Sequence, residues 1–182
     1  MSNFLINPYW FVPVGLSDTD WSGAGSNTSV SDGTVTATTS DSNYRLGGTQ
    51  ITKNSFELKV VFAPNANSAK FGYGITYSAV PDDSDDLRWG LEWFAGAVSP
   101  DKLLRVKEGG VTKASWTWTT NDYFTIVVTA GEVVYTHYNS GDVEQNTYTS
   151  DSAFDSTSED YYLSCMQGGY TESSNVYSQD NI

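Results

Sequence analysis

The sequence predicts an all-β protein, an antiparallel jelly-roll β-sandwich of roughly a dozen short strands. Apolar and polar residues alternate in segments of about four to nine residues, and turn residues separate these segments. No stretch of about a dozen residues repeats its apolar side chains every 3.6 positions, as an amphipathic helix would. The composition agrees, because 14% of the residues are aromatic, with 12 Tyr and 6 Trp, and only 17% are charged.

The first part of the chain is the least regular. Residues 15–33 form a connection rich in Gly, Ser, Asp and Thr, and Thr34–Thr38 and Tyr44–Leu46 follow it as short strand candidates. Ser55–Phe62 is the first clear strand, with its larger apolar side chains on one face. These side chains are Phe56, Leu58, Val60 and Phe62.

Two strands with the same alternation come next, Lys70–Tyr77 and Leu87–Phe94. We expect their larger side chains to face the core: Phe71, Tyr73, Ile75, Tyr77, Leu87, Trp89, Leu91 and Trp93. Their opposite faces should carry Gly72, Gly74, Thr76, Arg88, Gly90 and Glu92.

The C-terminal half predicts two hairpins, because strand-like segments flank Glu108-Gly109-Gly110 and Ala130-Gly131. The four hairpin strands are Leu103–Lys107, Val111–Trp118, Tyr123–Thr129 and Val133–Tyr138. Two more strands are expected, Gln145–Thr149 and Tyr161–Gln167. We therefore divide the chain into an N-terminal docking segment (1–14), a sandwich domain (15–170) and a polar C-terminal tail (171–182).

Charge and cysteine content exclude several classes of function. A chain of 182 residues suits one domain, and its net charge of −13 is opposite to that of nucleic-acid binders and of proteins that dock on anionic membranes. Cys165 is the single cysteine and His137 the single histidine, which excludes an internal disulfide and a multi-Cys metal site. We expect no membrane insertion, because no apolar run of about 18 residues occurs, and no secretory signal at the N-terminus.

The order of strands from Phe56 to Gly168 resembles the concanavalin A-like lectin/glucanase superfamily. The resemblance rests on Phe56–Phe62, Phe71–Ile75, Trp89–Phe94, the hairpin Leu104–Val111, Phe124–Tyr135 and Tyr161–Ser164. It implies two stacked, curved antiparallel sheets, one convex and one concave.

The front end, Asn3–Phe11, resembles the opening of small bacteriophage virion proteins such as head fibres, decoration proteins and tail receptor-binding proteins. Its apolar side chains should dock onto a partner: Phe4, Leu5, Ile6, Tyr9, Trp10 and Phe11. The resulting hypothesis is a non-enzymatic structural or decoration protein on the capsid or tail of a phage-like virion, with other virion proteins or further copies as partners. The alternative is a lectin-like module that binds host-surface carbohydrate.

Four residues are candidates for ligand binding. Arg88 and Glu92 should lie above the glycines of one sheet face, where they could hydrogen-bond a ligand or simply pair with each other. Trp116 and Trp118 share a strand face and could form a platform for a sugar ring, or could belong to the core.

Catalysis and cofactor binding are not expected. Glycanases need two carboxylates across a cleft, whereas Glu92 is the single carboxylate on its strand, so a glycan-cleaving enzyme is a second alternative. We expect no cofactor, although the acidic loop Asp82–Asp86 could either hold calcium or form a solvated hairpin tip.

Overall fold

The computed structural model describes residues 14–15, 21–22, 28–31, 34–37, 44–61, 70–77, 86–94, 103–119, 121–168 and 173–179. Every regular element in this part of the chain is a β-strand. None of the described residues belongs to a helix that is long and apolar enough to cross a membrane.

The strands fall into an N-terminal, a central and a C-terminal group. The first group comprises β1 (Val14–Gly15), β2 (Trp21–Ser22), β3 (Thr28–Ser31), β4 (Thr34–Ala37) and β5 (Tyr44–Ile51). The central group comprises β6 (Ser55–Val61), β7 (Lys70–Thr76), β8 (Leu87–Phe94), β9 (Leu103–Glu108) and β10 (Val111–Thr117). The last group comprises β11 (Tyr123–Thr129), β12 (Glu132–Tyr138), β13 (Glu144–Thr149), β14 (Tyr161–Gly168) and β15 (Ser173–Gln179).

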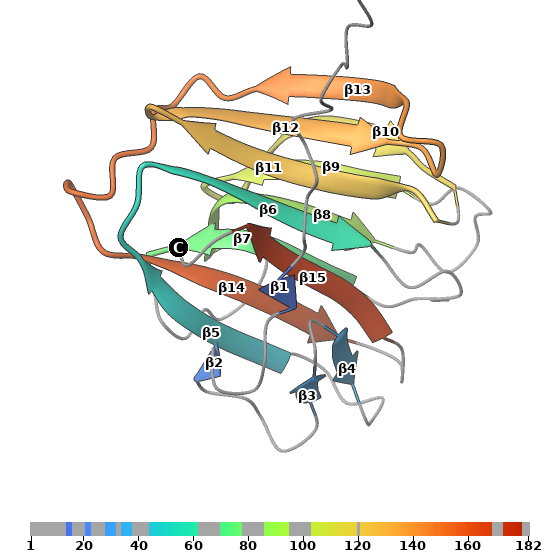
Figure 1. The fold of residues 1–182 in the computed structure, drawn as a ribbon, viewed down its shortest axis with the longest axis horizontal. Helices are drawn as coiled ribbons and strands as arrows, with labels where there is room; N and C mark the ends of the chain where they lie inside the picture. Colours follow the sequence, from blue (N-terminus) through green and yellow to red (C-terminus); the bar gives the residue numbers. More distant parts are fainter. Residues whose placement is uncertain are drawn as a thin grey trace, which may run out of the picture.

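These strands build two antiparallel sheets that lie face to face (Figure 1). The 8-stranded sheet has the order β13-β12-β11-β6-β15-β4-β3, and β1 pairs with β15 beside this path. The 7-stranded sheet has the order β10-β9-β8-β7-β14-β5-β2. The predicted all-β antiparallel sandwich is confirmed.

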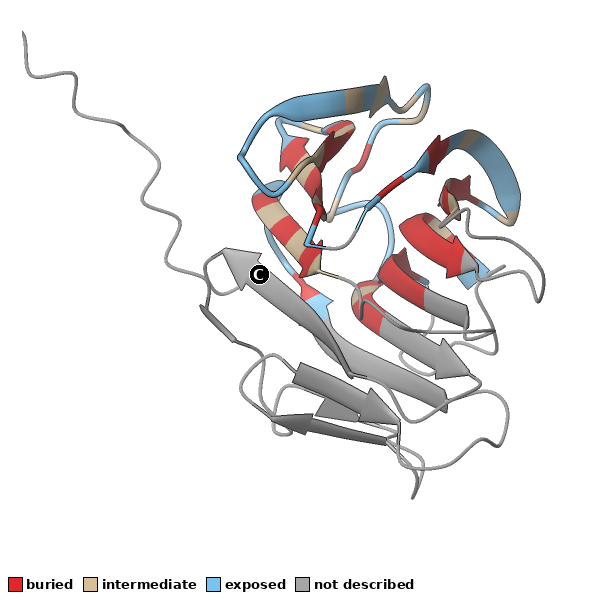
Figure 2. Ribbon diagram, turned by 90° about the vertical axis from the view of Figure 1, so that its right-hand side faces the viewer, coloured by how far each residue is buried: buried red, intermediate tan, exposed pale blue. Residues whose placement is uncertain are grey.

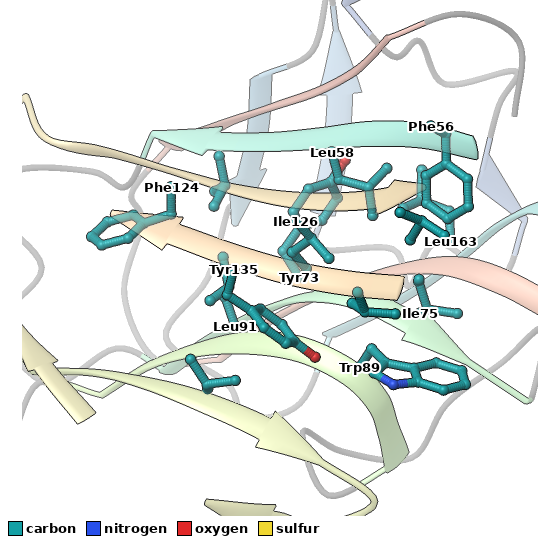
Figure 3. Packing of buried hydrophobic residues seen from close by; sticks show 14 of the residues in the cluster. Phe56, Leu58, Tyr73, Ile75, Trp89, Leu91, Phe124, Ile126, Tyr135 and Leu163 are labelled. Carbon is teal, nitrogen blue, oxygen red and sulfur yellow. The ribbon is translucent and has the colours of Figure 1, made fainter. Parts of the chain in front are cut away.

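The hydrophobic core lies between the sheets. Leu58, Val60 and Ile126 reach it from the 8-stranded sheet, and Ile75 and Leu91 from the 7-stranded sheet, all at 0% exposure. Figure 3 shows Leu58, Ile126, Ile75 and Leu91 among the side chains that pack between the strands. Figure 2 shows the burial alternating along the described strands, with exposed residues on the outer hairpins. A strand with one face in the core and one in solvent produces this alternation.

The C-terminal tail is the clearest difference from the predicted domain division. Residues 171–182 contain β15, which pairs with β6 along one edge and with β4 and β1 along the other. Its sequence, SSNVYSQ, is polar and short of apolar alternation, which is why it suggested a tail. Pairing through main-chain groups does not depend on that alternation.

Candidate functional site

The pairing of β7 with β8 is irregular at the start of β8. Ile75 pairs with Trp89, but its neighbour Thr76 pairs with Leu87, so Arg88 is an extra residue between the two pairs. Such an insertion is a β-bulge, and it moves the preceding side chains out of the regular alternation. The alternation predicted for Leu87–Phe94 is therefore wrong at its first two residues.

Leu87 and Arg88 consequently point where a regular strand would not send them. Leu87 is buried against Gly90, where a Cβ atom would come within 2.8 Å of Leu87 Cδ1, and it lies outside the core cluster. The guanidinium of Arg88 lies over the Trp89 ring, with Cζ 4.8 Å from the ring centroid. The same Cζ is 5.9 Å from the ring centroid of Tyr77. The bulge thus places the positive charge of Arg88 against a cluster of aromatic rings.

We call this cluster the aromatic end; it consists of Tyr77, Arg88, Trp89, Phe154 and Tyr161. Tyr77 is 49% exposed, and its ring centroid lies 5.3 Å from that of the buried Tyr161. Tyr161 in turn packs against Trp89 at 5.4 Å and Phe154 at 4.8 Å. Burial raises the pKa of Tyr161, so its hydroxyl stays protonated at neutral pH. A buried aromatic cluster therefore supports one ring that faces solvent.

Hydrogen bonds fix the loop that carries Phe154. The Phe154 amide donates to the carbonyl of Gly131 at 2.8 Å. The Ser156 amide donates to Asn54 Oδ1 at 2.7 Å, which ties the loop to the β5–β6 turn. The loop is therefore a firm support for the rings above it.

The outer face of the 7-stranded sheet is not the open surface that the glycines suggested. Gly72, Gly74 and Gly90 are all buried, and a Cβ atom at Gly74 would collide with the carbonyl oxygen of Trp89. Close approach of neighbouring main chains, rather than of a ligand, accounts for Gly74.

Glu92 lies on this face, but it does not pair with Arg88. It is 3% exposed, and its Oε2 atom lies 3.4 Å from Nη1 of Arg105 on β9. The alternative in which Arg88 and Glu92 pair is wrong, because the bulge turns Arg88 away toward the aromatic end. Arg88 and Glu92 consequently do not form one site.

Trp116 and Trp118 belong to the core, at 8% and 4% exposure. Trp118 packs edge-on against Trp93, with ring centroids 5.7 Å apart. Trp116 stacks on His137 at 6.4 Å and 16°. A sugar platform needs a ring face open to solvent, so their prediction as a binding pair is wrong and the core alternative holds.

Several predicted sites fall on residues outside the described part. These are the docking residues Phe4, Leu5, Ile6, Tyr9, Trp10 and Phe11, and most of the acidic loop Asp82–Asp86, of which Asp86 is described as exposed. Both remain predictions.

Sequence reasoning missed the exposure of Tyr77. It placed Tyr77 among the core-facing residues of Lys70–Tyr77, but β7 ends at Thr76 and the next residue leaves the sheet. The aspartate- and serine-rich segment that follows was the available signal, because strands end where such residues cluster.

Comparison with known proteins gives the fold its context. Neither the known protein families nor the curated proteins match the sequence. The exoplasmic/lumenal domain of VIP36, in a form bound to Ca²⁺ and Man3GlcNAc, has a TM-score of 0.56 at 14% identity, covering 90% of this chain and 85% of its own. A lectin from Bauhinia forficata in complex with GalNAc has a TM-score of 0.56 at 10% identity, covering 89% and 91%. The SPRY domain of human HERC1 has a TM-score of 0.55 at 15% identity, covering 92% and 100%. The chain therefore has the fold of the lectin-like β-sandwiches, in agreement with the concanavalin A-like resemblance of its sequence.

Proposed function

We propose that this protein is a non-catalytic carbohydrate-binding module that holds a sugar ring at the aromatic end. The observation that carries the proposal is the exposed ring of Tyr77, supported from behind by Tyr161 and flanked by the guanidinium of Arg88. Pyranose rings present flat C–H faces that stack on tyrosine, and their hydroxyls accept hydrogen bonds from guanidinium groups. The lectin-like fold supports this reading.

The arrangement suits weak, selective binding. Tyr77 loses little conformational freedom on binding, because Tyr161 already packs against its ring. The Arg88 guanidinium lies over the Trp89 ring, with its Cζ 5.9 Å from the ring centroid of Tyr77, so it could donate hydrogen bonds to a ligand stacked on Tyr77. Apolar stacking would supply the affinity, and Arg88 the preference among sugars.

The test is a glycan array followed by calorimetric titration with the best binder. We expect Tyr77→Ala to weaken binding at least tenfold, which is about 1.4 kcal/mol. Tyr77→Phe should retain most of the affinity, because it keeps the ring, and Arg88→Ala should change the order of preference on the array. Val143→Ala is the matched control, since Val143 is 56% exposed on a different loop. Absence of binding at millimolar glycan, or equal affinity in Tyr77→Ala, would refute the proposal.

Catalysis is not part of this proposal. Among the described residues, the predicted candidate Glu92 is buried and lies against Arg105, whereas glycoside hydrolysis needs a second carboxylate across the bond. The three structural neighbours described above are named as the exoplasmic/lumenal domain of VIP36, a lectin and a SPRY domain.

A role in a phage-like virion remains a second hypothesis, and it is compatible with carbohydrate binding. The hypothesis is supported by the apolar side chains of the N-terminal segment Asn3–Phe11. Strand β1 begins just after this segment, at Val14. Deleting residues 1–11 leaves β1 intact, so we expect the deletion to abolish attachment to particles while the melting temperature stays unchanged. Cosedimentation with purified particles measures this. Equal attachment of the deleted and the full chain would remove the docking role.

A further inference from the structure

Large apolar side chains that face solvent are few in the described part of the chain. They are Tyr77, Val111 and Val143, at 49%, 58% and 56% exposure. Tyr77 follows the end of β7, and Val111 is the first residue of β10, so both belong to the 7-stranded sheet. Val143 immediately precedes β13 of the other sheet. Tyr77 and Val111 are therefore the pair that one ligand can reach along a single sheet.

Strand pairing places the end of β7 and the start of β10 at the same end of the 7-stranded sheet. Thr76 pairs with Leu87, so β8 begins where β7 ends. The Gly109 amide donates to the carbonyl of Leu87 at 2.9 Å, so β9 ends beside the start of β8. Val111 pairs with Glu108, the last residue of β9. Only β8 and β9 thus separate the two exposed apolar side chains.

The side chain of Arg88 lies between them. Its Cζ atom is 5.9 Å from the ring centroid of Tyr77. Its Nη1 atom is 3.4 Å from the position that a Cβ atom would take at Gly109. Arg88 therefore reaches from the exposed tyrosine to the turn between β9 and β10, and a guanidinium group carries hydrogen-bond donors on several sides.

The turn between β9 and β10 carries no side chain that would keep a ligand away. Gly109 and Gly110 have φ angles of 55° and 80°, which favour glycine, and Gly109 is exposed. Nη1 of Arg88 is the single atom found within 4 Å of a Cβ atom placed at Gly109. A ligand can therefore lie against the main chain of the turn and continue from Arg88 to Val111.

The length of this surface exceeds one sugar ring. Neighbouring strands lie about 4.8 Å apart, so the three spacings from β7 to β10 amount to about 14 Å. A single pyranose stacked on Tyr77 covers a ring of its own size and leaves Val111 exposed. A ligand that contacts both needs about three linked rings over these three strand spacings.

We propose that the carbohydrate site extends along this end of the sheet, from Tyr77 past Arg88 to Val111, and binds a linear oligosaccharide of about three residues. The inference rests on the proposed carbohydrate binding at the aromatic end and names its ligand class. The first ring stacks on Tyr77, Arg88 donates hydrogen bonds to hydroxyls of the middle residue, and the third ring covers Val111.

The full chain is titrated calorimetrically with mannose, N-acetylglucosamine and galactose, each as a series of one to four linked residues. We expect the trisaccharide of the preferred series to bind at least tenfold more tightly than the monosaccharide. Linked rings add contacts without the entropy loss of a second association, whereas a fourth ring lies beyond Val111 and should add no more than about twofold.

Amide chemical shifts locate the ligand in the same samples. The monosaccharide should shift the Tyr77 amide and leave the turn between β9 and β10 unchanged. The trisaccharide should also shift the amides of Gly109, Gly110 and Val111.

A matched pair of valine variants tests the far end of the site. Val111→Ala should lower the trisaccharide affinity about threefold, because it removes apolar area under the third ring, and should leave the monosaccharide affinity unchanged. Val143→Ala is the control, since it makes the same substitution at nearly equal exposure. Gly131, whose carbonyl accepts from the Phe154 amide of the aromatic end, precedes β12, and Val143 follows the other end of that strand.

The outcomes separate this inference from the function on which it rests. Equal affinity for one and three residues, unshifted amides in the turn, or equal trisaccharide affinity in Val111→Ala and Val143→Ala would overturn the extended site and leave binding at Tyr77 standing. Absence of binding at every chain length would overturn the proposed function, and the extended site with it.

Discussion

Asp122 organises the turn before β11 through three side-chain contacts. Its Oδ2 accepts from the Thr119 amide at 2.8 Å, and its Oδ1 accepts from the Thr119 hydroxyl at 3.0 Å. Oδ2 also lies 2.9 Å from Nε2 of His137, whose Nδ1 lies 3.1 Å from the amide nitrogen of Asn146. Because an amide NH₂ can only donate, His137 accepts at Nδ1 and carries its proton on Nε2. One carboxylate thus links the turn to β12 and, through His137, to β13.

The ionised state of Asp122 should contribute to stability. Burial acts to raise the pKa of Asp122, but hydrogen bonds from the Thr119 amide, His137 and the Thr119 hydroxyl outweigh it and hold the pKa below its ordinary value. The pKa of Asp122 is therefore lower in the folded protein than in the unfolded chain. Ionisation of Asp122 stabilises the fold at pH values above the unfolded-state pKa, and this stabilisation is lost as the pH falls through the folded-state pKa.

We therefore expect Asp122→Asn to lose on the order of 1–3 kcal/mol near neutral pH. The difference from wild type should shrink as the pH falls from about 5 toward 2. Urea unfolding at a series of pH values measures it, with the exposed Glu159→Gln as control. A difference that stays constant down to the lowest pH would contradict the role assigned to the ionised carboxylate.

At the scale of the element, β15 joins three parts of the 8-stranded sheet. It pairs with β6 from Asn175 to Gln179, with β4 at its start and with β1 at its end. Removing it would leave the main chain of β6 without a partner along one edge, opposite buried residues such as Leu58 and Val60. Unpaired main-chain groups at such a position are costly.

Truncation tests this role of β15. A chain that ends at residue 172 should fail to fold or should melt far below the wild type, whereas a chain that ends at Gln179 keeps β15 and should match it. Circular dichroism during heating, together with gel filtration, distinguishes the outcomes. If both truncated chains melted at the wild-type temperature, β15 would not be a structural strand of the sheet.

At the scale of the whole molecule, pairings distant in sequence complete the sandwich. Val14 pairs with Ser178, and Tyr161 pairs with Ile51, so the first and last parts of the chain enter the same two sheets as the central hairpins. The closest antiparallel neighbours in sequence, such as β11 and β12, need only a tight turn. Distant pairings of this kind slow folding, because a long loop closes before the contact forms.

The strands between Ser55 and Gly168 could be predicted because most of them alternate apolar and polar residues between turn residues. Phe56, Leu58 and Val60 face the core as expected, and so do Tyr73 and Ile75. The candidate site could be predicted only in part. The sequence pointed to Arg88, but Tyr77 was assigned to the core.

The sequence by itself determined the fold class, the hairpins and most of the core, because the two-residue period of a strand is a local property that burial imposes on neighbouring residues. The tertiary structure alone decided where Arg88 points, that Glu92 lies against Arg105 and that β15 is a strand. A bulge depends on the register between two strands, and the partner of a buried carboxylate depends on the neighbouring strand. A polar strand is held by main-chain bonds to partners far away in the chain. None of these three is encoded in the residues next to the position concerned.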